Sequence, residues 1–302
     1  MKKKVLVAFS GGLDTSFCVK YLKEEKGYDV YTALVNTGGF SPSQLEEVEK
    51  KALALGAVSH CNIDITQEFY DKAIRYMIFG NVLRGNTYPI SVSSERVFQA
   101  IAIIEYAKQI GVHAVAHGST GAGNDQVRFD MIFQTLAPEI EIIALVRDLA
   151  LTRQQEIDYL KAHGVDASWE KSKYSINQGI WGTSVGGGET LHSEQTLPEE
   201  AYPSQLTETK VRTVYIAFEK GEPVGLDGQK MSPLKVITEL EKIASAYAIG
   251  RDMHVGDTII GIKGRVGFEA AAALVIIKAH HMLEKHTMTK WQAYWKQQIG
   301  DF

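Results

Sequence analysis

The chain has 302 residues, of which 45% are hydrophobic and 23% charged, and its formal net charge is −4. This composition is ordinary for a soluble globular protein of one large or two smaller domains. The acidic balance counts against nucleic acid as the main partner. No apolar run reaches the roughly 18 residues of a membrane span, so no membrane partner is expected either.

The first half of the chain alternates short apolar strands with amphipathic helices. The expected strands are 4–9, 29–35, 57–63, 114–117 and 141–144, and the expected helices are 14–25, 43–55, 67–79 and 94–110. This alternation predicts the α/β class, with a doubly wound and mostly parallel sheet. Ligands bind such sheets beyond the carboxyl ends of the strands. Three polar loops there, 10–16, 36–40 and 117–125, are expected to converge on one crevice.

The pattern changes after about residue 170, which predicts two domains, 1–170 and 171–302. Residues 172–203 are glycine-rich and polar, and we expect a long loop there, of the kind that is functional or disordered. The elements expected after it are strands at 211–218, 224–226 and near 258–262, and helices at 233–248 and 270–284. The first two strands form an antiparallel hairpin. The second domain is therefore expected to be a smaller α+β domain.

The most informative segment is Ser10-Gly11-Gly12-Leu13-Asp14-Thr15-Ser16, between the first expected strand and helix. Two adjacent glycines let the backbone approach a bound group. The free amides and the dipole at a helix start favour an anion, so the segment predicts a phosphate cradle. No lysine follows the glycines as in the common P-loop. A lysine-free cradle suits a nucleotide whose pyrophosphate leaves. The alternative is that Asp14, Thr15 and Ser16 only cap the helix.

A second polar segment, residues 117–129, follows the fourth expected strand and enters a helix. Its glycines expose the backbone, and Thr120, Asn124, Asp125 and Arg128 offer donors, an acceptor and a fixed cation. The alternative is that Asn124 or Asp125 is a helix cap and Arg128 a solvated helix residue. That alternative weakens if the segment faces the first loop across one crevice.

These two segments resemble argininosuccinate synthases, and residues 86–96 and 174–184 carry the same resemblance. It extends from about residue 3 to about residue 285. The first segment is shared with the wider group of pyrophosphate-releasing ATP enzymes, whereas the run from Gly123 to Phe129 is far more specific to this family. The family joins citrulline to aspartate. The ureido oxygen attacks the α-phosphorus of ATP, pyrophosphate leaves, and the aspartate amine then displaces AMP.

The resemblance implies a role for each matching position. ATP phosphates, bridged by Mg²⁺, would be held by Ser10, Gly11, Gly12, Asp14, Thr15 and Ser16, and Gly118 would face the nucleotide. Aspartate would be held by Thr120, Asn124 and Asp125, and the citrulline-like acceptor by Tyr88, Ser93, Arg128, Ser175 and Ser184. Asp14, Asp125 and Arg128 are predicted to lie nearest the chemistry, which acts by positioning and charge neutralisation. ATP binding falls to residues 1–170 and substrate binding to residues 171–302.

The chain also departs from the family pattern. Ala122 stands where the family has a lysine between two glycines, and Gly186 and Gly256 stand in place of two glutamates. Phe268 replaces a tyrosine. The long C-terminal arm that the family uses for oligomer contacts is missing, although a homo-oligomer is still expected.

The replaced glutamate and tyrosine normally face the amino-acid end of citrulline. A buried ammonium without a counter-charge is costly, by several kcal/mol. We therefore hypothesise that the acceptor is an N-acylated citrulline, whose α-nitrogen is neutral. The alternative is that another carboxylate, such as Glu189 or Asp257, swings in and keeps citrulline as the substrate.

Two other functions are compatible with the sequence. One is another pyrophosphate-releasing, amide-forming synthetase, and the other is a sensor that binds a nucleotide without catalysis. Cys18 and Cys61, the only cysteines, lie in expected core elements and lack the CxxC spacing. They indicate a reducing compartment, hence the cytoplasm. The histidines lack metal-ligand spacing, so no structural metal is expected.

Overall fold

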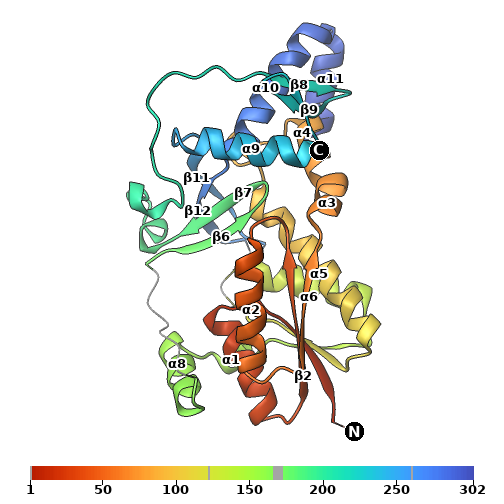
Figure 1. Cartoon of the computed structure of the whole chain (residues 1–302), viewed down its shortest axis with the longest axis vertical. Coiled ribbons are helices and arrows are strands. Elements are labelled where there is room, and N and C mark those ends of the chain that lie inside the picture. Colours follow the sequence, from red (N-terminus) through yellow and green to blue (C-terminus); the bar gives the residue numbers. More distant parts are fainter. Residues whose placement is uncertain (1, 122, 166–172, 260) are drawn as a thin grey trace. The chain divides into compact units, whose positions relative to one another are not determined.

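The computed structural model describes residues 2–121, 123–165, 173–259 and 261–302 (Figure 1). The chain forms two compact units, each assembled from segments that are distant in sequence. Unit 1 comprises residues 1–65, 96–171 and 258–262, and unit 2 comprises residues 66–95, 172–257 and 263–302. The division into domains at residue 170 stays a prediction; residues 66–95 fall in unit 2 and residues 258–262 in unit 1.

Unit 1 is built on a five-stranded sheet in the order β3-β2-β1-β4-β5, and all neighbouring strands are parallel. The strands are β1 (Lys4–Ala8), β2 (Asp29–Asn36), β3 (Ser59–Asp64), β4 (Ala114–Ala116) and β5 (Glu141–Ile143). The predicted doubly wound α/β domain is confirmed, with each strand within about two residues of its expected position.

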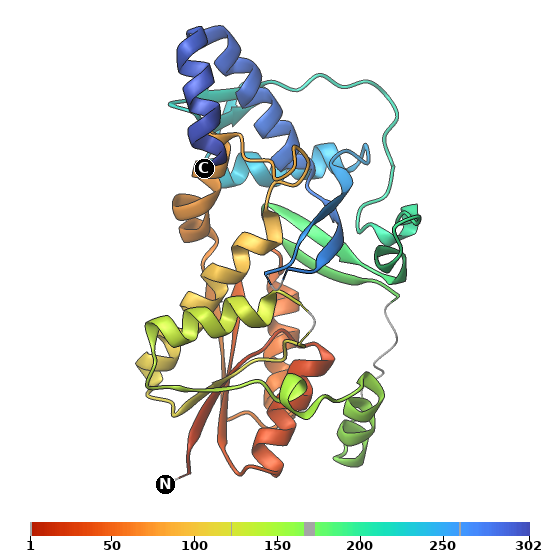
Figure 2. The same cartoon turned by 180° about the vertical axis from the view of Figure 1, so that it is seen from behind.

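Helices cover both faces of this sheet (Figures 1 and 2). One face carries α1 (Leu13–Glu24), α2 (Pro42–Ala54), α7 (Leu145–Leu149) and α8 (Arg153–Ala162), and the other carries α5 (Ser91–Ile110) and α6 (Asp125–Leu136). The period-two alternation of β1 explains the layering. Val5 and Val7 pack on the α1 side, Leu6 packs on the α5 side, and all three are fully buried.

The strand order reverses between β1 and β4, which lie side by side at the centre of the sheet. In open parallel sheets this reversal point is where ligands bind, because the loops after the two strands diverge to opposite faces. The two polar segments that the sequence singles out follow these two strands. The fold therefore places both at the expected binding edge of unit 1.

Unit 2 is an α+β assembly, as predicted. Its four-stranded antiparallel sheet has the order β11-β12-β7-β6, with β6 (Ser175–Gly179), β7 (Gly182–Gly186), β11 (Arg251–Asp257) and β12 (Lys263–Glu269). A smaller sheet has the order β10-β9-β8, with β8 (Ile216–Glu219), β9 (Glu222–Leu226) and β10 (Gln229–Lys230). The longer helices are α9 (Pro233–Ser245), α10 (Ala271–Thr287) and α11 (Lys290–Asp301).

The helix expected at 67–79 is a continuous run of α3 (Thr66–Phe69), a π-helical turn (Tyr70–Ile74) and α4 (Arg75–Gly80). None of the helices in the described part of the chain is both long and apolar enough to cross a bilayer.

The prediction of a long loop at 172–203 is wrong for most of the described residues in that range. Strands β6 and β7 form an antiparallel hairpin there, and short 3₁₀ turns follow at Gly188–Leu191 and Glu199–Ala201. Residue 172 itself lies outside the described part. Polar and glycine residues mask the strand pattern because β6 is largely exposed. Only β7, which pairs with β12 on its other side, is buried.

Two strand predictions for the second half of the chain are also wrong. Residues 258–262 form the turn between β11 and β12, closed by the Thr258 amide donating to the Ile262 carbonyl at 2.8 Å. Gly261 supplies the left-handed backbone that the turn needs, with φ +83°; Ile260 lies outside the described residues. The strand expected at 211–218 begins only at Ile216, because its partner β9 ends opposite that residue. Val211 is fully exposed.

Candidate active site

The loop after β1 leaves the start of α1 without a side-chain cap. Gly11 has φ +78°, a conformation that favours glycine, and Gly12 is the N-cap of α1. Some helices of the described chain are capped by a serine or threonine, namely Ser41, Thr152, Ser232 and Thr289, whereas α6, α7 and α10 also start without a side-chain cap. The first-turn amides of α1 are therefore not taken by a capping side chain, as an anion-binding helix start requires.

The hydroxyl groups of this loop divide into two kinds. Ser10 is exposed and Thr15 half-buried; their oxygens lie 3.4 Å apart, and the Thr15 hydroxyl also donates to the Gly12 carbonyl. Ser16 is fully buried, and its hydroxyl donates to the same carbonyl at 2.7 Å. Ser10 and Thr15 are thus accessible to a ligand. Ser16, which the sequence also assigns to phosphate binding, braces the helix start in this structure.

The loop after β4 packs directly on the first turn of α1. A Cβ at Gly118 would lie 3.0 Å from the Asp14 Cβ and 3.1 Å from the Thr15 amide nitrogen. These distances are tighter than an ordinary contact, so a side chain at 118 would require the start of α1 to shift by a few tenths of an ångström. The structure therefore brings together two of the three loops that are expected from the sequence to converge, and the convergence of the third, residues 36–40, stays a prediction.

A buried histidine holds the second loop in place. His117 Nε2 lies 2.8 Å from Asp130 Oδ1, and His117 Nδ1 accepts a hydrogen bond from the Ser119 amide at 3.2 Å. The imidazole therefore carries its proton on Nε2 and donates it to Asp130. Arg147 reaches the other oxygen of Asp130 at 2.6 Å. Burial by itself would raise the pKa of Asp130, but the hydrogen bonds from His117 and Arg147 hold that pKa below its usual range.

Asp125 lies between two guanidinium groups at the start of α6. Its Oδ1 accepts from Arg128 at 2.9 Å, and its Oδ2 accepts from Arg96 Nε at 3.0 Å. The neighbouring Asn124 does not cap α6; its Oδ1 accepts instead from the Ile259 amide at 2.7 Å. Thr120 is exposed. The structure thus brings Arg96, for which the family resemblance implies no role, into contact with Asp125 beside Arg128.

Two residues that the sequence pattern does not indicate lie beside the phosphate loop, residues 10–16. Lys51, on α2, donates to the Gly11 carbonyl at 2.5 Å. Glu156, on α8, is only 2% exposed, and its carboxyl group is close enough to Asp14 to interact with it electrostatically. Burial raises the pKa of Glu156 to about 8, and the neighbouring Asp14 carboxyl adds to the rise. Among the described residues, Glu156 Oε2 has no hydrogen-bond partner.

The Glu156→Gln variant is expected to be more stable than wild type at alkaline pH. The pKa of Glu156 rises from an ordinary 4.5 to about 8 on folding. Its contribution to stability is therefore complete below pH 4.5 and is lost as pH rises through about 8. Glutamine stays neutral, so the variant should gain about 1–3 kcal/mol relative to wild type between pH 5 and pH 9, the usual cost of an imperfectly paired buried group.

Denaturant unfolding of both proteins at several pH values measures this difference. Asp158→Asn, which removes an exposed carboxylate from the same helix, is the matched control and should show no such trend. A constant difference between Glu156→Gln and wild type over this range would mean that Glu156 does not titrate there.

The acceptor residues other than Arg128 lie in unit 2, around a buried aromatic pair. Tyr88 packs on Phe268, with ring centres 5.2 Å apart, and stacks on His254 at 5.3 Å. The Ser93 amide donates to the Tyr88 hydroxyl at 3.4 Å, and Ser184 is the register partner of Phe268. These residues form one group.

Ser175 lies apart from it, on β6, as the register partner of Gly186. Phe268 is fully buried, so its ring does not face a ligand directly in this structure.

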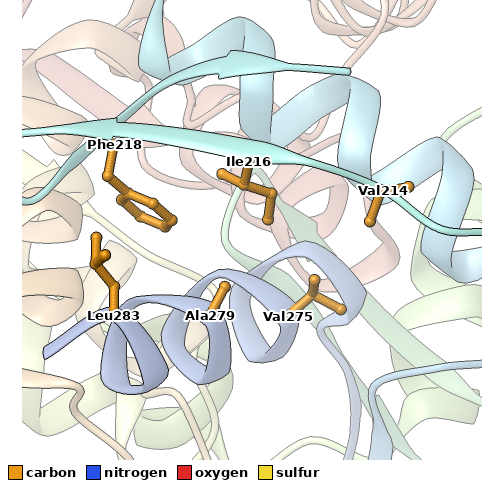
Figure 3. Close-up of a pocket in the computed structure, with 6 residues that line it drawn as sticks. All are labelled: Val214, Ile216, Phe218, Val275, Ala279 and Leu283. Carbon is orange, nitrogen blue, oxygen red and sulfur yellow. The ribbon is translucent and has the colours of Figure 1, made fainter. Parts of the chain in front are cut away.

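A groove of the described residues is of another kind. It has a volume of about 340 Å³ and lies between α10 and the segment from Val214 to Phe218, which includes most of β8 (Figure 3). It is lined by Val214, Ile216, Phe218, Val275, Ala279 and Leu283. All six side chains are apolar, so the groove offers no side-chain donor to a phosphate.

A parallel α/β sheet with two glycine-rich loops packed together at its reversal point defines a nucleotide-binding protein. Comparison with known families is more specific. Residues 4–166 match the arginosuccinate synthase N-terminal HUP domain, and residues 174–301 match the arginosuccinate synthase C-terminal domain. The chain belongs to the argininosuccinate synthase family.

Individual relatives agree with this assignment. The chain is 38% identical to the argininosuccinate synthase of Sulfurisphaera tokodaii over 98% of its own length and 76% of that protein's. It is 40% identical to the argininosuccinate synthase of Pyrococcus furiosus, over 95% of this chain and 70% of the relative. The family resemblance and the enzyme class predicted from the sequence, an ATP-using carbon–nitrogen ligase, are thereby confirmed.

Proposed function

We propose that the protein joins aspartate to citrulline, or to an N-acylated citrulline, at the expense of ATP, as a step of arginine biosynthesis. Family membership supports the reaction class. The observation that carries the site is the uncapped start of α1 packed against Gly118 at the reversal point of the sheet. We place the triphosphate there.

ATP would be held mainly by backbone. The first-turn amides of α1, the exposed Ser10 hydroxyl and the half-buried Thr15 hydroxyl would donate to phosphate oxygens, and the helix dipole favours the negative charge. Glycines at 11, 12 and 118 leave room for the phosphates. Mg²⁺ prefers oxygen ligands and phosphates, so it would be bound through the triphosphate and would neutralise its charge.

The reaction needs no covalent nucleophile from the protein. The ureido oxygen of the acceptor forms a bond to the α-phosphorus, and the bond to pyrophosphate breaks. The aspartate amine then attacks the ureido carbon, and the carbon–oxygen bond to AMP breaks. Holding three reactants in register can supply about 7–11 kcal/mol of the barrier. Arg96 and Arg128, held by Asp125, are placed to bind carboxylates or to neutralise developing charge.

Product analysis tests this function. Pyrophosphate should appear only when ATP, Mg²⁺ and the acceptor are present together, and AMP release should also require aspartate. A nucleotide sensor would release neither product. An amide-forming synthetase of the same group would release pyrophosphate and AMP when its acceptor is a carboxylate, and it would need no ureido compound.

We further propose that the acceptor carries an acylated α-nitrogen. The two carboxylates that could replace the family's glutamate already hold other groups. Glu189 lies 3.4 Å from Lys173 Nζ and accepts from the Tyr174 hydroxyl, and Asp257 lies 2.7 Å from Lys263 Nζ. Both contacts of Glu189 are made by Oε1, whereas its Oε2 is buried without a hydrogen-bond partner among the described residues, so only Asp257 would have to break an ion pair to serve a substrate ammonium.

The surroundings of Gly256 support the same proposal. A Cβ at Gly256 would lie 2.6 Å from His254 Nε2, so the imidazole fills the space where the side chain of a glutamate would begin. Burial, assisted by Arg84, lowers the pKa of His254 and favours its neutral form. The neighbourhood of Tyr88 therefore suits an uncharged group better than an ammonium.

The preference of the enzyme among acceptors is expected to depend on the charge of the acceptor's α-nitrogen. N-acetylcitrulline or N-succinylcitrulline should exceed citrulline in kcat/KM by about tenfold or more, since leaving an ammonium unpaired costs several kcal/mol. Steady-state assays with the three compounds at saturating ATP and aspartate measure the ratio. A clear preference for free citrulline would reject the acylated acceptor and leave the ligase function intact.

Two broader expectations stay proposals. Cys18 and Cys61 are both free thiols, which is consistent with a reducing compartment such as the cytoplasm. We also expect a homo-oligomer, which light scattering of the purified protein would test.

A further inference from the structure

Helix α2 contacts the phosphate loop through two residues on one of its faces. A Cβ at Gly11 would lie 3.3 Å from Val48 Cγ2, so this valine packs on the backbone of the loop. Lys51 follows three residues later, on the same side of the helix. Its Nζ donates to the Gly11 carbonyl at 2.5 Å. The two side chains thus hold the same glycine, one by packing and one by a charge-assisted hydrogen bond.

The position of this ammonium has an electrostatic consequence. Gly11 immediately precedes Gly12, the N-cap of α1, so a phosphate bound at the helix start lies close to Lys51. The Lys51 side chain is half-buried, and burial lowers its pKa. Charges in a partly desolvated place interact more strongly than charges in bulk water. An anion bound at the loop would therefore interact much more strongly with Lys51 than with an exposed lysine.

We propose that Lys51 is the phosphate-loop cation of this enzyme, supplied by α2 and not by the loop itself. It holds the Gly11 carbonyl in place, and its charge strengthens binding of the triphosphate. In the common P-loop the lysine lies within the motif. Here it lies 40 residues after Gly11, so motif spacing does not reveal it. The inference rests on the proposed binding of ATP at this loop.

A purely structural role makes a different prediction. If Lys51 only fastens α2 to the loop, its removal should weaken all nucleotides that use the loop by the same factor. If its charge acts on the phosphates, the loss should increase with the negative charge of the nucleotide. Comparing AMP, ADP and ATP therefore separates the two roles.

Calorimetric titration of the three nucleotides into the wild type, Lys51→Gln and Lys51→Arg measures this dependence. Glutamine keeps an N–H donor toward the Gly11 carbonyl and removes the charge, whereas arginine keeps the charge. We expect Lys51→Gln to lose about 10–100-fold in ATP affinity, less for ADP and least for AMP, as for one lost charge-assisted contact. Lys51→Arg should recover most of the ATP affinity.

Lys50→Met is the matched control, because Lys50 is the exposed neighbour on the same helix and should leave all three affinities unchanged. Thermal melting confirms that each variant is folded, and Lys51→Met replaces Lys51→Gln if the latter does not fold. An equal loss for AMP, ADP and ATP, or no loss, would overturn the proposal. A wild-type protein that binds no nucleotide would instead contradict the ATP site itself.

Discussion

Gly12→Val is expected to abolish ATP binding and leave the protein folded. Gly12 has φ −72°, which any residue adopts, and a Cβ there would meet only Ser10 Oγ, at an ordinary 3.4 Å. The fold therefore tolerates a side chain, at a cost of about 1 kcal/mol for a poorer N-cap. A β-branched side chain at this exposed position would cover the amides that phosphate must approach. We expect the Kd for ATP to rise more than 100-fold, since several backbone hydrogen bonds to charged oxygens are lost together.

Two other glycines provide the comparison. Gly11→Val should unfold at a lower temperature, because φ is +78° there and Val48 lies 3.3 Å from the new Cβ. Gly188→Val should change neither stability nor ATP affinity, since a Cβ at Gly188 has no neighbour within 4 Å. Calorimetry and thermal denaturation give both quantities. Unchanged ATP affinity in a folded Gly12→Val protein would remove the cradle assignment.

Asp125→Asn is expected to impair the use of aspartate much more than the binding of ATP. The carboxylate holds Arg96 and Arg128 and is our proposed partner for the aspartate ammonium. Asparagine retains the shape and loses the charge. Losing a charged hydrogen bond costs about 1.5–3 kcal/mol, so kcat/KM for aspartate should fall roughly 10–100-fold.

The matched control for this prediction is Asp148→Asn. Asp148 is an exposed carboxylate that also pairs with an arginine, Arg147, at 3.1 Å. Its loss should leave the kinetics nearly unchanged, because exposed pairs contribute little. If Asp125→Asn raised only the KM for ATP, the role of Asp125 toward aspartate would be wrong.

Unit 1 could be predicted almost completely because its signals are local. The strands are apolar runs between helices with clear starts, and Gly11 and Gly12 follow the first of them. The same reasoning fails for the larger sheet of unit 2. Its strands contain glycines such as Gly186, Gly256 and Gly267, which break the alternation, and β6 is largely exposed. Pairing between distant segments forms this sheet, and a single sequence does not display pairing.

The residues of the candidate site likewise fall into those that the sequence indicates and those that it does not. The glycine-rich segments are recognisable in the sequence, and they contain Ser10, Gly12, Thr15 and Gly118. Lys51, Arg96 and Glu156 stand on ordinary helices, and nothing in their local sequence distinguishes them from surface residues. Glu156 is buried only because α8 packs on α1, where Tyr159 contacts Phe17 with ring centres 5.2 Å apart. Such residues become visible only when the fold brings them to the loop.

The fate of the ureido oxygen tests the central claim, an adenylated ureido intermediate, most directly. The acceptor that the enzyme uses is labelled with the heavy oxygen isotope in its ureido group and converted with ATP and aspartate, and the AMP is analysed by mass spectrometry. Attack of this oxygen on the α-phosphorus, followed by cleavage of its bond to carbon, predicts AMP that carries one labelled oxygen and pyrophosphate that carries none. Unlabelled AMP formed along with the aspartate adduct would contradict the proposed reaction path.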